Sequence, residues 1–383
     1  MRDYLNESAT THFLFPIDGD CLNDRDGKLV QEGMTVSVSV SSAPHSVVTV
    51  NGISATEEGG IYRADVCLAA GRNVLLAKNE TDGTTAEISA WFLPHATGKY
   101  HISVDDNILL FADLTANKDT YRSIFENPYL AVYKKAHDLY GAKVNLNIFY
   151  EFNRESAVFF SDERPDFNLS MMTDRFKEEW EANADWLKLS FHSRAEMPDM
   201  PYRDATPEEI IADYQAVRSE IVRFAGEKSF SECVTMLHWG EGNPACVAAL
   251  RELGYRVLTG YFEIGRKTGE PVVAYYAPVL LTAHIGERDF FYDTEMGIGF
   301  GRIDRVTNIG TYESVMEDIR AVMAHPHRGG FVSYMIHEQY YYKDYIHYLP
   351  DFEARVLGPA KLLYENGYRG SFIKDAVAEL PRP

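Results

Sequence analysis

Two adjacent carboxylates, Asp105 and Asp106, follow a strand-like segment in the stretch YHISVDDN at residues 100–107. Carboxylates this close raise each other's pKa unless a cation lies between them. One interpretation is therefore a bound cation. The other is a turn, because Asp and Asn side chains hydrogen-bond the local backbone where strands end. The choice depends on which other residues lie at the same place in the fold.

Further polar residues follow other strand-like segments of the chain. His192 ends LKLSFHS, His238 nearly ends CVTMLHW, and His337 nearly ends the run GFVSYMIHE. If these segments are the parallel strands of one β/α barrel, their carboxyl ends meet at one rim, where such folds place their chemistry. A ring of acids, imidazoles and a phenol at one rim favours a functional site over turn chemistry; its other members are Glu151, Tyr261, Glu263 and Asp304.

The elements that must position these residues begin at about residue 98. From there, strand-like and helix-like segments alternate, for example KVNLNIFYE and then the Thr-capped TPEEIIADYQAVRSEIVRFAG after LKLSFHS. About seven or eight such strands, each followed by a helix, predict an α/β fold of the parallel β/α barrel type over residues 98–383. We expect an irregular insertion after RVLTGYF, through about residue 300, and then one strand at RIDRVTN.

Residues 1–97 follow a different pattern. The run MTVSVSVSS alternates with period two, and short runs of this kind are separated by Gly, Asn and Asp turn signals. This pattern predicts a small all-β sandwich. The stretch YRADVCLAAGRNVLLAKNETDG resembles the closing strands of bacterial immunoglobulin-like modules, which implies an accessory domain without chemistry of its own.

Composition excludes several classes of partner. The 383-residue chain has a formal net charge of −20 and no run of Lys and Arg, which argues against nucleic acid and against an anionic membrane surface. The sequence has no apolar stretch of about 20 residues, and MRDYLNESATTHFLFP has no apolar core of a secretory signal. We therefore expect a cytoplasmic protein, or a secreted one if the sequence has been trimmed. The sequence predicts no oligomeric state.

Three of these motifs together resemble the polysaccharide deacetylase (NodB-homology) family of carbohydrate esterases. ISVDDN resembles its Thr-Phe-Asp-Asp motif, LSFHSRAE its His-Ser/Thr-x-x-His motif, and MIHEQYY its late strand that ends in Leu-x-His. ALRELGYRVLTGYF resembles a helix of that family which ends at Gly-Tyr before the next strand. The resemblance covers most of residues 98–383 and implies an irregular seven-stranded β/α barrel that removes acetyl groups from carbohydrates.

The resemblance also implies roles for individual residues. Asp105 would be the general base, Asp106 and His192 would hold a divalent metal, and His337 would protonate the leaving amine. The metal would be zinc, with cobalt, manganese or nickel as alternatives. Such an ion polarises the carbonyl of the acetyl group and lowers the pKa of its bound water to about 7. The implied substrate is an acetylated glycan or amino sugar, with N-acetyl favoured over O-acetyl.

The sequence departs from the family pattern at two places. Position 196 is Glu where the family has its second His, and the i, i+4 spacing would place His192 and Glu196 on one face of a helical turn. Glu196 is then a metal ligand, or else His238 or water completes the site. The family's Arg-Pro-Pro-x-Gly motif is replaced by LHWGEGN, so the Arg that orients the base is missing.

The remaining site candidates are predicted substrate contacts. Trp239 would stack on a sugar ring, while His238 and Glu241 lie beside it in the sequence. Tyr261 follows a strand, and Tyr340 is the best candidate in the tyrosine-rich run EQYYYKDYIHY.

Two alternatives belong to other functional classes. A glycoside hydrolase could use two carboxylates such as Asp106 and Glu241, placed roughly 5–10 Å apart, without a metal. A non-catalytic carbohydrate-binding protein could keep the barrel while its metal site has decayed, as Glu196 and the missing Arg allow.

Overall fold

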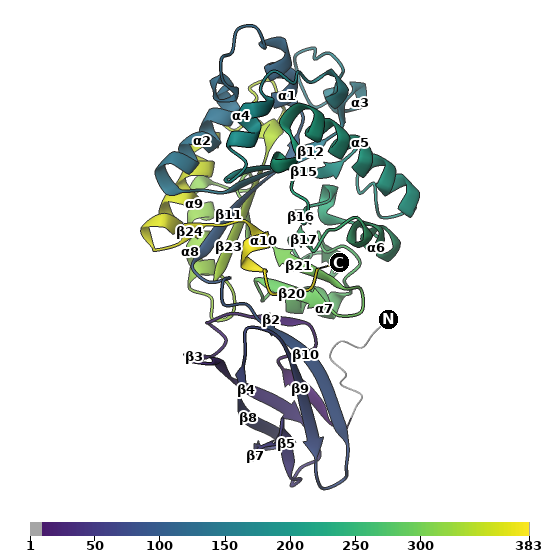
Figure 1. Cartoon of the computed structure of the whole chain (residues 1–383), viewed down its shortest axis with the longest axis vertical. Coiled ribbons are helices and arrows are strands. Elements are labelled where there is room, and N and C mark those ends of the chain that lie inside the picture. Colours follow the sequence, from purple (N-terminus) through teal and green to yellow (C-terminus); the bar gives the residue numbers. More distant parts are fainter. Residues whose placement is uncertain (1–9, 383) are drawn as a thin grey trace.

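The computed structural model of the chain describes residues 10–382. The sequence on which the expectation about a secretory signal rests lies partly outside these residues. The first part of the described chain consists of strands joined by turns, and these strands extend below the helix-containing part in Figure 1. They are β1 (His12–Phe15), β2 (Asp20–Leu22), β3 (Lys28–Val30), β4 (Gly33–Ser41), β5 (Val48–Val50), β6 (Ile53–Ser54), β7 (Thr56–Glu58), β8 (Ile61–Leu68), β9 (Gly71–Asn79) and β10 (Thr85–Phe92).

The period-two pattern of β4 explains how these strands pack. Val36, Val38 and Val40 are buried on one face while the intervening residues point outward, as strand geometry requires. They share a core with Leu75 and Ala77 of β9, which belongs to a different sheet. Two sheets therefore pack face to face in this part of the chain. The immunoglobulin-like character and the boundary at residue 97 stay predictions.

The second part of the chain is mixed α/β. Its helices are α1 (Leu109–Ala116), α2 (Pro128–Tyr140), α3 (Arg154–Ala157), α4 (Lys177–Ala182), α5 (Pro207–Ala225), α6 (Pro244–Glu252), α7 (Val279–Ile285), α8 (Tyr312–Met323), α9 (Phe352–Glu365) and α10 (Ile373–Ala376). Its strands are β11 (Lys99–Asn107), β12 (Val144–Phe149), β13 (Glu151–Phe152), β14 (Phe167–Asn168), β15 (Leu187–Ser193), β16 (Val234–Thr235), β17 (Val257–Gly260), β18 (Glu263–Ile264), β19 (Pro271–Val272), β20 (Phe290–Asp293), β21 (Ile298–Arg302), β22 (Arg305–Val306), β23 (Phe331–His337) and β24 (Arg369–Gly370).

The main strands form two parallel arrays. One has the order β15-β12-β11-β23-β22, and the other has the order β16-β17-β21. The chain passes from the second array to the first between β21 and β22: Ile303 N–H donates to Gly260 O at 2.7 Å, and Asp304 N–H donates to Ser333 O at 2.7 Å. The sequence predicted one strand here, and the structure has two short ones because the chain changes its pairing partner.

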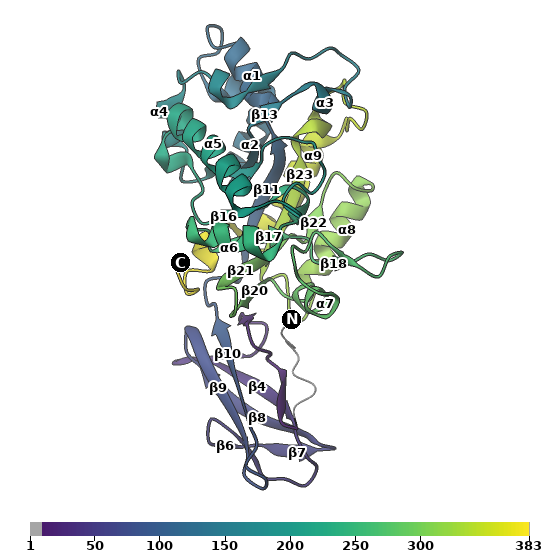
Figure 2. The ribbon, with the colours of Figure 1, turned by 90° about the vertical axis from the view of Figure 1, so that its right-hand side faces the viewer.

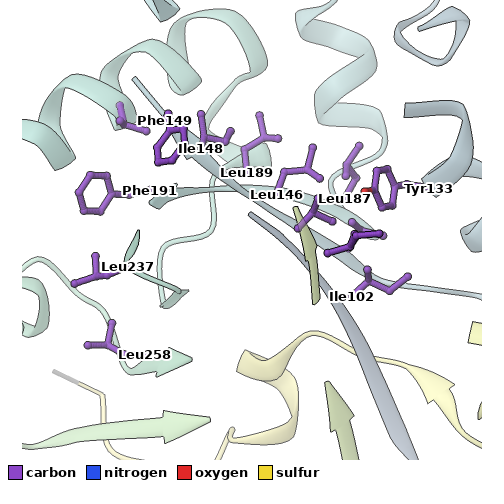
Figure 3. Close-up of a cluster of buried hydrophobic side chains, with 14 of the residues drawn as sticks. Ile102, Tyr133, Leu146, Ile148, Phe149, Leu187, Leu189, Phe191, Leu237 and Leu258 are labelled. Carbon is purple, nitrogen blue, oxygen red and sulfur yellow. The ribbon is translucent and has the colours of Figure 1, made fainter. Parts of the chain in front are cut away.

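The strands β11, β12 and β15 are buried on both faces. Ile102, Leu146 and Leu189 belong to the apolar cluster shown in Figure 3. Side chains alternate along a strand, so Ser103, Asn145, Asn147 and Ser190 fall on the opposite face. These four polar side chains are also buried, and they are joined by hydrogen bonds, for example Asn145 Nδ2 to Ser190 Oγ at 2.8 Å. This polar inner face lies directly below the carboxylates at the end of β11.

Sheet pairing also joins the two parts of the chain. β2 pairs with β10 on one side and with β20 on the other, so one nine-stranded sheet runs from β16 to β6. Around β2, the buried Asp20 accepts a hydrogen bond from His284 at 2.5 Å, and Asp26 accepts one from Arg288 at 2.6 Å. Arg25 donates to three backbone carbonyls just beyond the end of α8. Ion pairs and a shared sheet therefore fix this joint.

Candidate metal centre

Three metal-ligand side chains meet at the carboxyl ends of the strands. Asp106 lies near the end of β11, His192 near the end of β15, and His238 in a short 3-10 helix after β16. Their ligand atoms all lie within 4.8 Å of one another. Asp106 Oδ1 is 3.1 Å from His192 Nε2 and 3.4 Å from His238 Nδ1. All three side chains are buried.

The second nitrogen of each histidine ring is held by a backbone carbonyl. His192 Nδ1 lies 2.6 Å from Met236 O, and His238 Nε2 lies 2.9 Å from Glu196 O. A carbonyl only accepts, so these two nitrogens carry protons and the rings present His192 Nε2 and His238 Nδ1 toward Asp106. Metal-binding histidines are oriented by outer hydrogen bonds of this kind.

The charges around this group favour a cation. Burial opposes protonation of His192, but Asp105 and Asp106 raise its pKa above the ordinary value. Burial also opposes ionisation of Asp106, yet the charge of His337 and the hydrogen bonds of His192 and His238 hold its pKa well below the usual range. One carboxylate and two imidazoles form a donor set that suits zinc and similar transition metals. The residues present therefore fit a divalent metal.

The backbone gives Asp106 its position. Its φ is +64°, in the left-handed region that non-glycine residues rarely occupy, and the register between β11 and β12 shifts between Val104 and Asn107. The neighbouring Asn107 secures this bend, because its Nδ2 donates to Val104 O at 2.6 Å and to Asn147 O at 3.0 Å. A strained residue held in place in this way is frequent at functional sites.

Asp105 belongs to the polar inner face. Its Oδ1 accepts a hydrogen bond from Asn147 Nδ2 at 2.6 Å and one from Ser103 Oγ at 3.3 Å, and the side chain is buried. The sequence predicted a base without its orienting Arg, and the structure provides Asn147 at that carboxylate instead.

His337 lies directly opposite Asp105 in the register between β11 and β23. Its Nδ1 is 2.8 Å from Asn308 Oδ1, and its Nε2 is 4.0 Å from Asp106 Oδ2. The ring of Tyr340 lies 6.0 Å from the His337 ring. The structure therefore places His337 at the edge of the ligand group, with Tyr340 beside it.

Glu196 lies next to the ligand group but not within it. The expected helical turn is absent, because β15 continues to Ser193 and residues 194–200 form bends. Gln339, which the sequence did not single out, donates from Nε2 to both Asp106 Oδ2 and Glu196 Oε2 at 2.8 Å. Burial and the charge of Asp106 raise the pKa of Glu196 to about 8.

A small apolar cavity adjoins these carboxylates. It has a volume of about 10 Å³, which is room for about one water-sized group. Asp106, Glu196 and Gln339 line one side, and the rest of the lining is mostly apolar, including Ile108, Leu109, Phe149, Phe152, Phe159 and Phe160.

Two residues of LHWGEGN have clear surroundings. Trp239 has a φ of +62° and is 43% exposed, and its ring lies 6.1 Å from that of His238. Glu241 forms an ion pair with Arg203 at 3.3 Å, and burial raises its pKa. Trp239 is thus an exposed ring beside the ligand group, whereas the carboxylate of Glu241 is engaged by Arg203.

Tyr261 is not brought to the ligand group. It lines a separate cavity on the flank of the α/β part, where the guanidinium of Arg302 lies 5.7 Å from the centre of its ring. That cavity shares no lining residue with the metal-ligand group.

Comparisons with known proteins give structural likenesses only. No family model and no curated protein matches the sequence. The chain is similar to the solved structure of Agd3, a novel carbohydrate deacetylase, with 9% identity over 90% of this chain and 71% of that one and a TM-score of 0.43. It is similar to a CE4 family pseudoenzyme from Bacillus anthracis, with 9% identity over 74% of this chain and 66% of that one and a TM-score of 0.36.

A third similar structure is a family 4 acetyl xylan esterase from Clostridium thermocellum in complex with a cobalt ion. The identity is 10% over 73% of this chain and 90% of that one, and the TM-score is 0.34.

Within residues 10–382, no helix is both long and apolar enough to cross a membrane.

Proposed function

We propose that this protein is a metal-dependent hydrolase that removes acetyl groups from a carbohydrate, with N-acetyl groups favoured. The observation that carries the proposal is the buried group of Asp106, His192 and His238. In each histidine, the ring nitrogen that points away from Asp106 is hydrogen-bonded to a backbone carbonyl. The likeness of ISVDDN, LSFHSRAE and MIHEQYY to deacetylase motifs supports the same assignment.

His238, rather than Glu196, is the third ligand in this proposal. Its Nδ1 lies 3.4 Å from Asp106 Oδ1 and belongs to the group of three ligand atoms that lie within 4.8 Å of one another, whereas Glu196 does not belong to that group. The ion is zinc, with cobalt, manganese or nickel as alternatives. When bound, it supplies Lewis-acid polarisation of the acyl carbonyl and acidifies water.

The residues around the ligand group then divide the proton transfers. Asp105 takes a proton from the attacking water, and Asn147 fixes the orientation of its carboxylate. His337 gives a proton to the leaving amine from Nε2, because its Nδ1 is held by Asn308. The register of β11 and β23 pairs Asp105 with His337 on neighbouring strands, which supports the assignment of these two residues as base and acid.

The surroundings suit an acetylated sugar. The small cavity beside Asp106 has mostly apolar walls, which suit the methyl end of an acetyl group. Trp239 offers an exposed ring for a sugar face, with Tyr340 beside His337.

The proposal includes the architecture that the sequence predicted. The strands β11, β12, β15, β16, β17 and β23, together with the broken strand β21–β22, form an irregular seven-stranded barrel. Residues 1–97 form an accessory sandwich. The parallel arrays and the crossing from β21 to β22 support the barrel.

The glycoside hydrolase alternative has less support. It needs Asp106 and Glu241 as a working pair, and Glu241 is paired with Arg203 instead. The non-catalytic alternative is tested by activity alone, because it predicts a bound glycan that is not deacetylated.

Metal content measured by elemental analysis tests the assignment of the ligands. After loading with zinc and dialysis, wild-type protein is expected to hold about one ion per chain, and Asp106→Ala and His238→Ala to hold less than about a tenth of that. Glu196→Gln and the control His325→Ala, which removes a histidine paired with Glu287 elsewhere, should keep the metal.

Acetate release from N-acetylglucosamine oligomers, compared with acetylated xylan, tests the reaction. Release that stops on chelation and returns with zinc supports the proposal. A wild-type protein that binds none of the four metals would contradict it, and metal lost in Glu196→Gln but kept in His238→Ala would reverse the choice of third ligand.

A further inference from the structure

A polar cavity, the one that Tyr261 lines, lies on the flank of the α/β part, away from the candidate metal centre. It has a volume of about 470 Å³, and its lining includes the β18–β19 hairpin, the end of β21 and the start of β22. Figure 2 shows the hairpin standing out from the side of the molecule near α7 and α8. An adjoining cavity of about 340 Å³ shares Glu263, Arg266, Arg302 and Arg328 with it. We call the two together the flank pocket.

Four arginines line the flank pocket: Arg266, Arg302, Arg305 and Arg328. The guanidinium groups of the last three form hydrogen bonds within the protein. Arg302 NH1 donates to Tyr261 O at 2.9 Å and to Phe262 O at 3.1 Å. Arg305 donates to Ile309 O at 2.7 Å, and its Nε lies 3.0 Å from Asp318. Arg328 NH1 donates to Gly286 O at 2.8 Å. The three guanidinium groups are thus held in defined orientations by backbone or carboxylate oxygens.

Some of the hydrogen-bonding capacity in the flank pocket is unused. Arg302 is only 6% exposed, and its Nε has no hydrogen-bond partner among residues 10–382. Its nearest carboxylates, Asp304 and Glu263, lie at 3.8 and 3.7 Å, beyond hydrogen-bond distance. The Nε of Arg328 and Oδ1 of Asp304 are also buried without a partner in this part of the chain. Buried polar atoms of this kind are costly, and these three belong to residues that line one cavity.

The flank pocket does not share the strong negative charge of the chain. Its lining has four arginines and four carboxylates, those of Glu263, Glu287, Asp304 and Asp318, whereas the whole chain carries a net charge of −20. No carboxylate of the described residues forms an ion pair with Arg266 or Arg328. A fixed guanidinium with free N–H groups is the donor that proteins use for carboxylates and phosphates.

We propose that the flank pocket binds a small anionic ligand that also carries hydroxyl groups, of the class of sugar acids. Arg266 and Arg328 would receive its anionic group, and the exposed carboxylate of Glu263 would accept hydrogen bonds from its hydroxyls. The ring of Tyr261 and the apolar side chains Ile264 and Val272 line the same cavity and provide contact area. This site is independent of the proposed hydrolase chemistry, because it shares no residue with the ligand group.

Calorimetric titration of the full chain with sodium glucuronate, inorganic phosphate and glucose tests this site. The titrations are made in chelator, so that metal loss at the other site does not matter. We expect glucuronate to bind with a Kd below about 1 mM and glucose not to bind. Arg328→Gln and Arg266→Gln should each weaken binding at least about ten-fold, whereas Arg320→Gln, on the exposed face of α8, should not.

The results of these titrations distinguish a site for a sugar acid, a site for a phosphate-bearing ligand, and no anion site. Tighter binding of glucuronate than of phosphate supports a sugar acid, and the reverse overturns that class in favour of a phosphate-bearing ligand. No binding of either anion up to about 10 mM, or binding that is unchanged in both arginine variants, overturns the flank pocket as an anion site. Unfolding midpoints within about 2 °C of wild type establish that the variants are folded. Acetate release should be unchanged in Arg328→Gln.

Discussion

At the scale of single residues, the left-handed backbone of Asp106 explains how two neighbouring carboxylates acquire different surroundings. Asp105 hydrogen-bonds to Asn147 on the polar inner face, whereas Asp106 faces His192 and His238. Asn107 does use its side chain to secure the bend, so the turn chemistry expected from the sequence is present as well. A backbone bend held by an Asn side chain and a candidate cation site therefore coexist in YHISVDDN.

Replacing Asn147 tests the orientation of the proposed base. Asn147→Ala removes the 2.6 Å hydrogen bond to Asp105, and we expect kcat to fall about ten- to a hundred-fold while KM and metal content stay near wild type. Asn147→Ser, which keeps a hydroxyl donor, should recover part of the rate. Steady-state kinetics together with elemental analysis measure this. A loss of metal, or an equal loss in both variants, would show that Asn147 has a structural role instead.

Trp239 tests the substrate face. Because its ring is exposed and does not contact a proton-transfer group, Trp239→Ala should raise KM about ten-fold for a chitooligosaccharide and change kcat little. Trp239→Phe should lie between the two. A large fall in kcat with unchanged KM would argue against sugar stacking at this position.

The type of its side chain decides whether a residue of the candidate site could be identified from the sequence. The sequence singles out Asp105, Asp106, His192, His238 and His337 because each lies at the end of an apolar strand-like run, where a β/α fold places its chemistry. Asn147 and Gln339 are ordinary polar residues, and only the fold shows that they hydrogen-bond to the carboxylates of Asp105 and Asp106. The prediction that His192 and Glu196 share a helical turn was wrong, because β15 extends past His192 to Ser193.

At the scale of elements, Glu338 connects two strand ends. Its carboxylate accepts hydrogen bonds from the backbone N–H groups of Ile108, Leu109 and Leu110 at the start of α1, at 2.6, 2.8 and 2.6 Å. Glu338 directly follows His337, and α1 begins shortly after Asp106. The orphan donors of a helix N-terminus are thereby used to hold β23 and β11 together beside the site.

This cap predicts a pH dependence. Burial raises the pKa of Glu338 from 4.5 to about 7, so the folded protein holds a proton that the unfolded chain has lost between these values. The contribution of this group is therefore largest below about pH 4.5 and is lost as pH rises to about 7, by on the order of 3 kcal/mol. The free energy of unfolding from urea titrations at pH 5 and pH 7.5 should fall less in Glu338→Gln than in wild type. The exposed control Glu353→Gln should match wild type, and an unchanged slope in Glu338→Gln would refute the assignment.

The order of elements was predicted better than their pairing. The strands containing HISVDD, KVNLNIF and LKLSFHS and the capped helix α5 were found because their apolar pattern and caps are local signals. The region before residue 300 was expected to be irregular, but it contains α7 and the strands β18 to β21. Short strands such as β20 depend on partners distant in the sequence, and no local pattern identifies them.

At the scale of the whole molecule, the joint around β2 predicts that the two parts of the chain unfold as one unit, not as two parts connected by a linker. The nine-stranded sheet and the buried group Asp20, Asp26, His284 and Arg288 cross this joint. We expect a single calorimetric unfolding transition for wild type. Arg288→Ala should remove the guanidinium that Asp20 and Asp26 share and lower the free energy of unfolding by about 3–5 kcal/mol.

The control for this joint is Arg63→Ala, which removes an exposed ion pair with Glu58 and should cost less than about 1 kcal/mol. Differential scanning calorimetry distinguishes the cases. Two separate transitions in wild-type protein would show that the parts unfold independently, and so would an Arg288→Ala variant whose loss is confined to one of two transitions.

The polar inner face has a consequence for how this fold can change. Hydrogen bonds between Asn145, Asn147, Ser190 and Ser103 have direction as well as partners, so they fix the register of three strands from the inside while apolar side chains fix it from the outside. A substitution at one of these positions leaves its neighbours unsatisfied inside the protein. These four positions should therefore be substituted together, not one at a time, as related sequences diverge. The orientation of the Asp105 carboxylate should be kept only where the whole set of hydrogen bonds is kept.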